Sequence, residues 1–109
     1  TWGSMKEIVQ TESFRCWEQN VNDPRAKTLI AARLFRLANG LPGDVKPVGE
    51  GISEIRIHYG PGYRIYFKSQ GNILIILLSC GNKNSQDKDI ILAKTLARSL
   101  EHREFIHHD

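Results

Sequence analysis

Three consecutive stretches between residues 52 and 80 have the residue pattern of β-strands, and they restrict the possible folds more than any other part of the chain. Apolar and polar residues alternate along Ile52–Tyr59 and Tyr63–Lys68, as in strands with one buried face. The run Ile73–Leu78 is apolar throughout, which favours a strand that is covered on both faces. The sequence therefore predicts an antiparallel three-stranded meander, with Ile73–Cys80 at the centre of the sheet.

The residues before the meander predict one more strand and two helices. Lys6–Gln10 has the pattern of a short strand, and Ser13–Asn20 that of a short helix. Asp23 followed by Pro24 is typical of a helix start, with the aspartate as N-cap and the proline at the first helical position. This second helix is expected to end at about Ala38. Because an isolated strand would be unstable, Lys6–Gln10 is expected to join the meander sheet.

The residues on either side of the three strands complete the predicted topology. Residues 40–51 contain four glycines and two prolines, which predicts a loop. Apolar residues at helical spacing predict a last helix from Asp87 to about Arg103. The expected order is β-α-α-β-β-β-α. This order predicts a compact α+β fold, with the N-terminal strand added to the antiparallel meander sheet and helices packed against it.

The length of 109 residues fits one domain, which we expect to span residues 5–103. The four residues before Met5 look like a cloning remnant, and residues 104–109 form a polar tail. No apolar run approaches the roughly 20 residues of a membrane span, and we find no secretion signal. Cys16 and Cys80 are therefore expected to be reduced thiols in the cytoplasm, with no membrane association.

Positive charge is concentrated in the middle of the chain. The whole chain carries a net charge of +3, whereas residues 24–83 hold nine basic and three acidic residues. An excess of this kind permits a polyanion such as RNA as a partner. Lys46 and Lys68 are candidate RNA-binding residues within this basic segment.

The predicted hairpin places several of these charges on one face. A three-residue turn of Gly60, Pro61 and Gly62 keeps the apolar sets of both strands together. In that register His58 lies opposite Arg64, Arg56 opposite Tyr66, and Glu54 opposite Lys68. One face then presents the side chains of Arg56, His58, Arg64, Tyr66 and Lys68, and Lys83 follows in the loop before the last helix.

This set of side chains suits RNA cleavage without a metal or another cofactor. The 2′-hydroxyl must lose a proton, the 5′-oxygen must gain one, and the phosphorane between them carries extra negative charge. Arginine and lysine stabilise that charge, histidine can transfer the protons, and Tyr66 can stack on a base. A metal-dependent nuclease would need clustered carboxylates, which this face lacks.

Specific segments of the chain point to a known family. They are Gly60-Pro61-Gly62-Tyr63-Arg64, the Gly-x-Lys-x-x-Gln pattern at 81–86, Asp23–Ala26 and Gly43–Gly49. With the rest of Gly51–Ile91, they resemble the RelE/ParE toxin superfamily of type II toxin–antitoxin systems. Within it the chain is most similar to the phage-derived addiction-module killer proteins, close to HigB-type toxins. The likeness extends from residue 5 to about residue 100.

The resemblance implies a RelE-like fold and a toxin that cuts mRNA in the ribosomal A site. It implies a helix-turn-helix antitoxin as partner, with operator DNA bound only through that antitoxin. Arg64 matches the arginine that stabilises the transition state, and Lys83 a basic position after the last strand. Arg56 and His58 match positions from which catalytic lysines or histidines project. At about Asp89, however, RelE proper has a catalytic tyrosine, so the general base is not identified.

Other interpretations of the same residues stay open. The chain could be a ParE-like inhibitor of DNA gyrase without nuclease activity, or an inactive remnant that only binds its antitoxin. Arg64 could pair with a carboxylate across the sheet, Lys68 could be the partner of Glu54, and Tyr66 could be a packing residue. The last group of candidates for the missing base is His102, His107 and His108.

Overall fold

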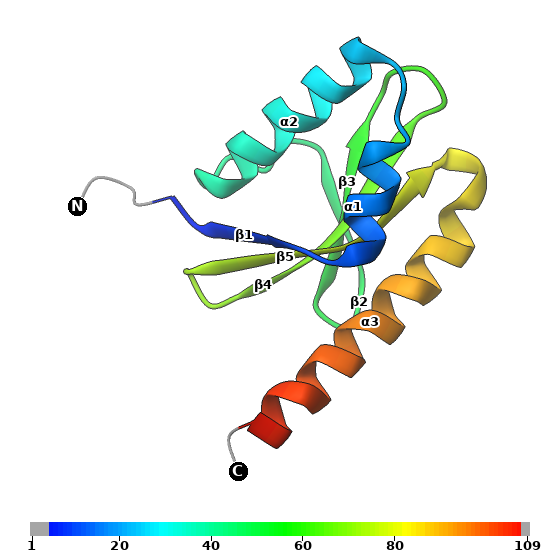
Figure 1. Ribbon diagram of the computed structural model, residues 1–109. Coiled ribbons are helices and arrows are strands. Elements are labelled where there is room, and N and C mark those ends of the chain that lie inside the picture. The colour runs from blue at the N-terminus through cyan, green and yellow to red at the C-terminus, as the bar shows by residue number, and fades with distance from the viewer. Residues whose placement is uncertain (1–4, 108–109) are drawn as a thin grey trace.

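The computed structural model describes the backbone of residues 5–107 and the side chains of residues 5–101. In this part the chain forms one mixed five-stranded sheet and three α-helices, which confirms the predicted α+β class (Figure 1). The elements are β1 (Glu7–Gln10), α1 (Glu12–Gln19), α2 (Pro24–Ala38), β2 (Val45–Gly49), β3 (Ile52–Ile57), β4 (Tyr63–Gln70), β5 (Leu74–Asn82), a single 3-10 turn (Lys83–Ser85) and α3 (Gln86–His107). The predicted remnant at residues 1–4 lies outside the described residues, as do residues 108–109 of the predicted tail.

The strand order across the sheet is β1-β5-β4-β3-β2. The strands from β2 to β5 pair antiparallel with their sequence neighbours, and β1 lies parallel to β5 at the edge. The expectation that the first strand joins the sheet is thus confirmed. The expected centre is wrong, because β4 occupies the middle position and β5 lies between β4 and β1.

The second strand, β2, is absent from the predicted order, since its residues were assigned to a loop. Pro47 lacks an N–H group, but an edge strand tolerates this, and the pairing with β3 shifts register between Pro47 and Gly49. The turn that follows has positive φ at Gly49, Glu50 and Gly51. Two of these three positions carry glycine, which adopts that conformation without strain. The glycines therefore belong to a hairpin turn between two strands.

The hairpin between β3 and β4 has a different register from the predicted one. Arg56 lies opposite Arg64, Glu54 opposite Tyr66, and Ile52 opposite Lys68. β3 ends at Ile57, so five residues connect the strands rather than three. The shift is two residues, which leaves every side chain on its predicted face. The physical reason lies in Tyr59, whose hydroxyl donates to Asp23 Oδ2 at 2.6 Å and holds the loop against α2.

Apolar side chains fill both sides of the sheet. One core cluster joins β3, β4 and β5 to α1 and α2, and includes Phe14, Ile30, Ile55, Ile65 and Leu77. The other joins the opposite face to α3 through Ile52, Tyr66, Ile76, Leu78, Ala93 and Ala97. The molecule thus has three layers, with α1 and α2 over one face of the sheet and α3 over the other.

The helix starts follow local capping chemistry. Asp23 caps α2 as predicted, its Oδ1 accepting from the Arg25 amide at 2.9 Å, with Pro24 in the first turn. Thr11 caps α1 by accepting from the Phe14 amide at 3.2 Å. Its hydroxyl also donates to the Leu78 carbonyl at 2.6 Å, which fixes α1 to β5. No helix in the described part of the chain is long and apolar enough to cross a membrane.

Candidate functional site

A fully buried carboxylate on β3, Glu54, is the centre of a polar cluster on the face of the sheet that α3 covers. Its side chain is 0% exposed. Its Oε1 accepts from Arg56 Nε at 2.9 Å and from Arg64 Nη1 at 3.1 Å. Its Oε2 accepts from the Tyr66 hydroxyl and from Gln86 Nε2, each at 2.8 Å. Four donors therefore satisfy this carboxylate without water, as a buried charge requires.

The pairing of the strands explains why these side chains meet. Glu54 and Tyr66 are direct neighbours across β3 and β4, and Arg56 and Arg64 form the next pair. Gln86 is the first residue of α3, so it reaches the carboxylate from the helix side. Two arginines directly opposite each other would repel. The carboxylate that both contact offsets this repulsion.

Burial and the donors have opposing effects on the ionisation of Glu54. Removal from water raises its pKa, but the bonds from Arg56, Tyr66 and Gln86 and the charge of Arg64 outweigh this. The net pKa lies below the ordinary value, so Glu54 is ionised at neutral pH. Burial, followed by the bond to Glu54, raises the pKa of Tyr66. Tyr66 is therefore a neutral hydrogen-bond donor.

Solvent reaches both arginines at the edge of this cluster. The side chain of Arg64 is 12% exposed and that of Arg56 is 29% exposed. The bond to Glu54 raises the pKa of Arg56 above its ordinary value. Within the described residues, the side-chain hydrogen bonds of each arginine use one nitrogen and end on Glu54. The remaining N–H groups of the two guanidinium groups are hydrogen-bond donors that the site could offer to an anionic ligand.

His58 lies beyond the end of β3 and pairs with Asp44, which immediately precedes β2. The distance between His58 Nε2 and Asp44 Oδ2 is 2.6 Å. The bond from His58 holds the pKa of Asp44 below its ordinary value, and the nearby charge of Arg56 adds to this effect. Since the ionised carboxylate only accepts, Nε2 carries the proton in this bond. The Nδ1 atom of a neutral ring is then free to take a proton, and the imidazole is 74% exposed.

Two more predicted basic residues lie on the surface around this set. Lys83 begins the 3-10 turn after β5 and is exposed. A Cβ atom at Gly62 would lie 3.4 Å from Lys83 Cβ, so the turn and the β3–β4 loop are in contact. Lys46 on β2 is also exposed and lies opposite Glu54 in the sheet. Both lysines are therefore accessible to a polyanion.

One predicted RNA contact, the stacking of Tyr66 on a base, does not fit the structure, and Lys68 has a different ion-pair partner from the one expected. Tyr66 is 0% exposed and packs under α3, so it cannot stack on a base. Lys68 forms an ion pair with Glu101 on α3 and not with Glu54. The physical reason is the register, which places Lys68 two residues further from Glu54 than expected. The prediction that Arg64 pairs with a carboxylate across the sheet is confirmed, and that carboxylate is Glu54.

Asp89, at the position of the tyrosine expected from the resemblance, has a structural role. Its Oδ2 accepts a short hydrogen bond from Ser85 Oγ, and its backbone carbonyl accepts from Ser79 Oγ at 2.8 Å. A Cβ atom at Gly81 would lie 1.9 Å from Asp89 Oδ2. Asp89 therefore packs directly on the β5 backbone at the start of α3. The side chains of His102, His107 and His108 lie outside the described residues.

Sequence reasoning missed the residues that organise the site. The predicted register pairs Glu54 with Lys68, and Asp44 and Gln86 enter the sequence analysis only as parts of the family-like segments. One signal for Glu54 was present in the sequence, because it is the single acidic residue among the side chains that alternate with apolar residues between Glu54 and Lys68. No local pattern marks Asp44, whose partner His58 is 14 residues away.

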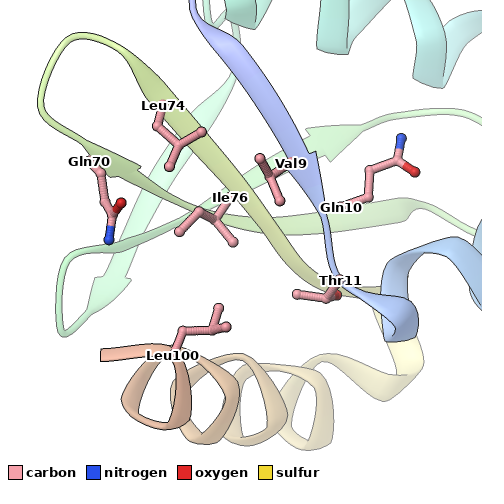
Figure 2. Close-up of a pocket in the computed structure, with 7 residues that line it drawn as sticks. All are labelled: Val9, Gln10, Thr11, Gln70, Leu74, Ile76 and Leu100. Carbon is pink, nitrogen blue, oxygen red and sulfur yellow. The ribbon is translucent and has the colours of Figure 1, made fainter. Parts of the chain in front are cut away.

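A separate cavity of about 220 Å3 lies between the β1–β5 edge of the sheet and the C-terminal half of α3. Figure 2 shows Val9, Leu74, Ile76 and Leu100 directed into it. Its lining contains none of the predicted site residues. Among the described residues, no group of three or more histidine, cysteine, aspartate and glutamate residues could hold a metal ion.

Comparison with known proteins finds a relative that matches most of the chain. No protein-family model matches the chain. A Haemophilus influenzae protein described as uncharacterized is 48% identical to the chain over 94 residues. The match covers 86% of this chain and 95% of the Haemophilus protein, so the two sequences correspond over nearly the whole domain.

Proposed function

The chain belongs to the same family as this Haemophilus influenzae protein, and we propose that it is a RelE/ParE-type toxin that cuts mRNA. In this proposal it has a RelE-like fold, belongs to the addiction-module killer branch close to HigB, and acts in the ribosomal A site. The basis is the resemblance of Gly51–Ile91 to that superfamily, together with the chemistry of the polar cluster. The reaction is metal-independent phosphodiester cleavage.

The observation that carries the proposal is the pair of arginines held on one buried carboxylate. Arg56 and Arg64 each donate a hydrogen bond from one nitrogen to Glu54 Oε1, at 2.9 and 3.1 Å. Fixing both guanidinium groups before the substrate arrives lowers the cost of ordering them in the transition state. Their remaining N–H groups suit the oxygens of a phosphate. Lys83 and Lys46 add positive charge for the RNA backbone on either side.

In the proposed reaction, the 2′-oxygen of the RNA attacks the adjacent phosphorus and the bond to the 5′-oxygen breaks. His58 Nδ1 takes the proton from the 2′-hydroxyl, since His58 Nε2 already carries a proton, which it donates to Asp44. Arg56 and Arg64 stabilise the charge that develops on the phosphorane oxygens. The departing 5′-oxygen takes a proton from solvent. The products are a 2′,3′-cyclic phosphate and a 5′-hydroxyl.

The proposed partners follow from the same surface. A helix-turn-helix antitoxin with an acidic segment would cover the exposed lysines and arginines and keep RNA away. The toxin would contact operator DNA only through this antitoxin. The proposed site of action is the cytoplasm, where ribosomes and mRNA are available, and no membrane partner is proposed.

The test is primer extension on translating mRNA after brief induction of the chain. The wild type should give codon-phased cuts, and Arg64→Ala should reduce them by about 100- to 1000-fold, the usual loss for one transition-state donor. Arg36→Ala is the matched control, because Arg36 is an exposed arginine on α2 away from the cluster. It should cut like the wild type. Urea unfolding of both variants establishes that they are folded.

Other outcomes would replace the proposal. Growth arrest without cuts would favour a ParE-like inhibitor of DNA gyrase, which a supercoiling assay would then detect. Neither cuts nor arrest would favour an inactive remnant that binds the antitoxin. Undiminished cutting by a folded Arg64→Ala variant would remove Arg64 from the site.

A further inference from the structure

An arginine on α2, outside the polar cluster, binds the backbone of the segments that carry the site. Arg33 Nη1 donates to the Arg56 carbonyl at 2.7 Å. Arg33 Nη2 donates to the carbonyls of Pro42 at 3.0 Å and Asp44 at 3.2 Å. One guanidinium group therefore connects α2, the segment before β2 and the end of β3.

The Arg33 side chain is partly buried, and its surroundings leave space for it. Its Nε is buried and has no hydrogen-bond partner among the described residues. Burial lowers the pKa of Arg33 from its ordinary value, although the group stays charged at neutral pH. Gly43 has a positive φ, and a Cβ atom there would lie 3.1 Å from Arg33 Nη2. The unfavourable burial of this cation requires compensating bonds, which the three carbonyls supply.

Two of the three bonded carbonyls, those of Arg56 and Asp44, belong to residues of the proposed site. The Asp44 carbonyl also accepts from the Arg56 amide at 3.1 Å, which continues the pairing of β2 with β3 by one residue. The same Asp44 binds the His58 imidazole through its side chain. Asp44 therefore connects Arg33, which binds its backbone carbonyl, to His58, which binds its side chain.

We propose that Arg33 is a positioning residue, which fixes the Asp44 backbone so that the Asp44 carboxylate holds the His58 ring in one orientation and one tautomer. This inference rests on the proposed function for the catalytic meaning of His58. Planar guanidinium N–H groups can reach three carbonyls at once, whereas a lysine ammonium has no such fixed fork. Without Arg33, the segment before β2 loses its anchor and the Asp44–His58 bond loses its fixed geometry.

The primary test reads the His58 tautomer directly and does not require nuclease activity. Long-range 1H–15N spectra of the purified chain are recorded at about pH 8, above the ordinary titration range of histidine. A His58→Gln variant assigns the His58 signals among the four histidines. The wild type should show His58 protonated at Nε2 alone. Arg33→Met should show both tautomers, and Arg33→Lys should give an intermediate result.

The secondary test measures cleavage. Arg33→Met should lower the maximal cutting rate by roughly 10- to 100-fold, which is the scale of a small misplacement of a reacting group. RNA affinity should change little, because both terminal nitrogens of Arg33 are already bonded to backbone carbonyls. The matched control is Arg98→Met, which removes an arginine that donates two bonds to Glu50 at 3.0 and 2.7 Å at the far end of β2. It should leave both the His58 tautomer and the cutting rate unchanged.

The outcomes separate this inference from the proposed function. An unchanged His58 tautomer in folded Arg33→Met overturns the positioning role, whatever the nuclease assay gives. An equal tautomer change in Arg33→Met and Arg98→Met also overturns the positioning role, since the change would then reflect a general loss of structural order and not the loss of the Arg33 bonds. A tautomer change specific to Arg33 variants, in a chain that never cuts RNA, supports the positioning role and refutes the nuclease.

Discussion

At the scale of single residues, the dominant feature is the buried charge of Glu54. An isolated carboxylate in an apolar interior would take up a proton. Here four donors approach it, and two of them are cationic. The charge of Glu54 is thus tied to the positions of Arg56 and Arg64. A change at Glu54 acts on both stability and the proposed chemistry.

Glu54→Gln should destabilise the protein by about 1–3 kcal/mol, because an amide cannot accept from all four donors and leaves buried groups unpaired. The variant should also change the dependence of stability on pH. The folded-state pKa of Glu54 lies below its ordinary value of 4.5, so the unfolded chain binds its proton first. This stabilisation is complete above that value and disappears as the pH falls below it.

Urea unfolding between about pH 3 and pH 7 measures this effect, since that range brackets an ordinary carboxyl titration. The wild type should lose stability on acidification more steeply than Glu54→Gln. Glu7→Gln, at an exposed position on β1, is the control and should follow the wild type. Parallel curves for wild type and Glu54→Gln would contradict the role assigned to this carboxylate.

At the scale of elements, the start of α3 depends on close approach to β5. Ser85 and Asp89 lie directly over Gly81, where a Cβ atom would be 2.5 Å from Ser85 Oγ and 1.9 Å from Asp89 Oδ2. Ser79 adds a bond to the Asp89 carbonyl at 2.8 Å. Gln86, at the same end of α3, reaches Glu54. Because Gly81 has no side chain, the start of α3 can approach β5 closely enough for Gln86 to reach the polar cluster around Glu54.

Gly81→Ala should therefore destabilise the protein by about 1–3 kcal/mol, as an overpacked site does. Gly40→Ala is the comparison, since a Cβ atom at Gly40 meets nothing within 4 Å and the variant experiences only the strain of a positive φ. Chemical denaturation followed by circular dichroism measures both. Adding Asp89→Ala to Gly81→Ala should recover part of the loss, and no recovery would show that the Asp89 contact is not the cause.

At the scale of the whole molecule, one sheet separates two apolar cores. Leu77 and Leu78 are neighbours on β5 and both are 0% exposed, yet Leu77 belongs to the core under α1 and α2 and Leu78 to the core under α3. Both cores share the same strands. The layers are therefore expected to unfold together as one cooperative unit.

Leu77→Ala and Leu78→Ala should each cost about 2–5 kcal/mol, the range for a buried leucine. Circular dichroism and the fluorescence of Trp17, in a Trp2→Phe background, should give the same urea midpoint in both variants. Trp17 contacts the core under α1 and α2, with its ring 5.9 Å from that of Phe14. A fluorescence midpoint above the dichroism midpoint in Leu78→Ala would mean that the α3 layer unfolds separately.

The sequence by itself determined the elements whose signals are local. Asp23 and Pro24 mark the start of α2 because capping involves adjacent residues. Alternation along β3 and β4 assigned side chains to the correct faces, since the period of a strand is a local property. The basic candidates Arg56 and Arg64 likewise follow from the predicted strands, and Lys83 from the predicted loop before the last helix.

Only the tertiary structure decided the register, the strand β2 and the identity of the organising groups. Register in the β3–β4 hairpin depends on Tyr59 reaching Asp23, 36 residues away, and no local rule contains that contact. Pro47 and its neighbouring glycines match a loop until β3 supplies a partner strand. The bonds of Glu54 to Gln86 and of Arg33 to Asp44 likewise span 32 and 11 residues. Such contacts form only when packing brings distant segments together.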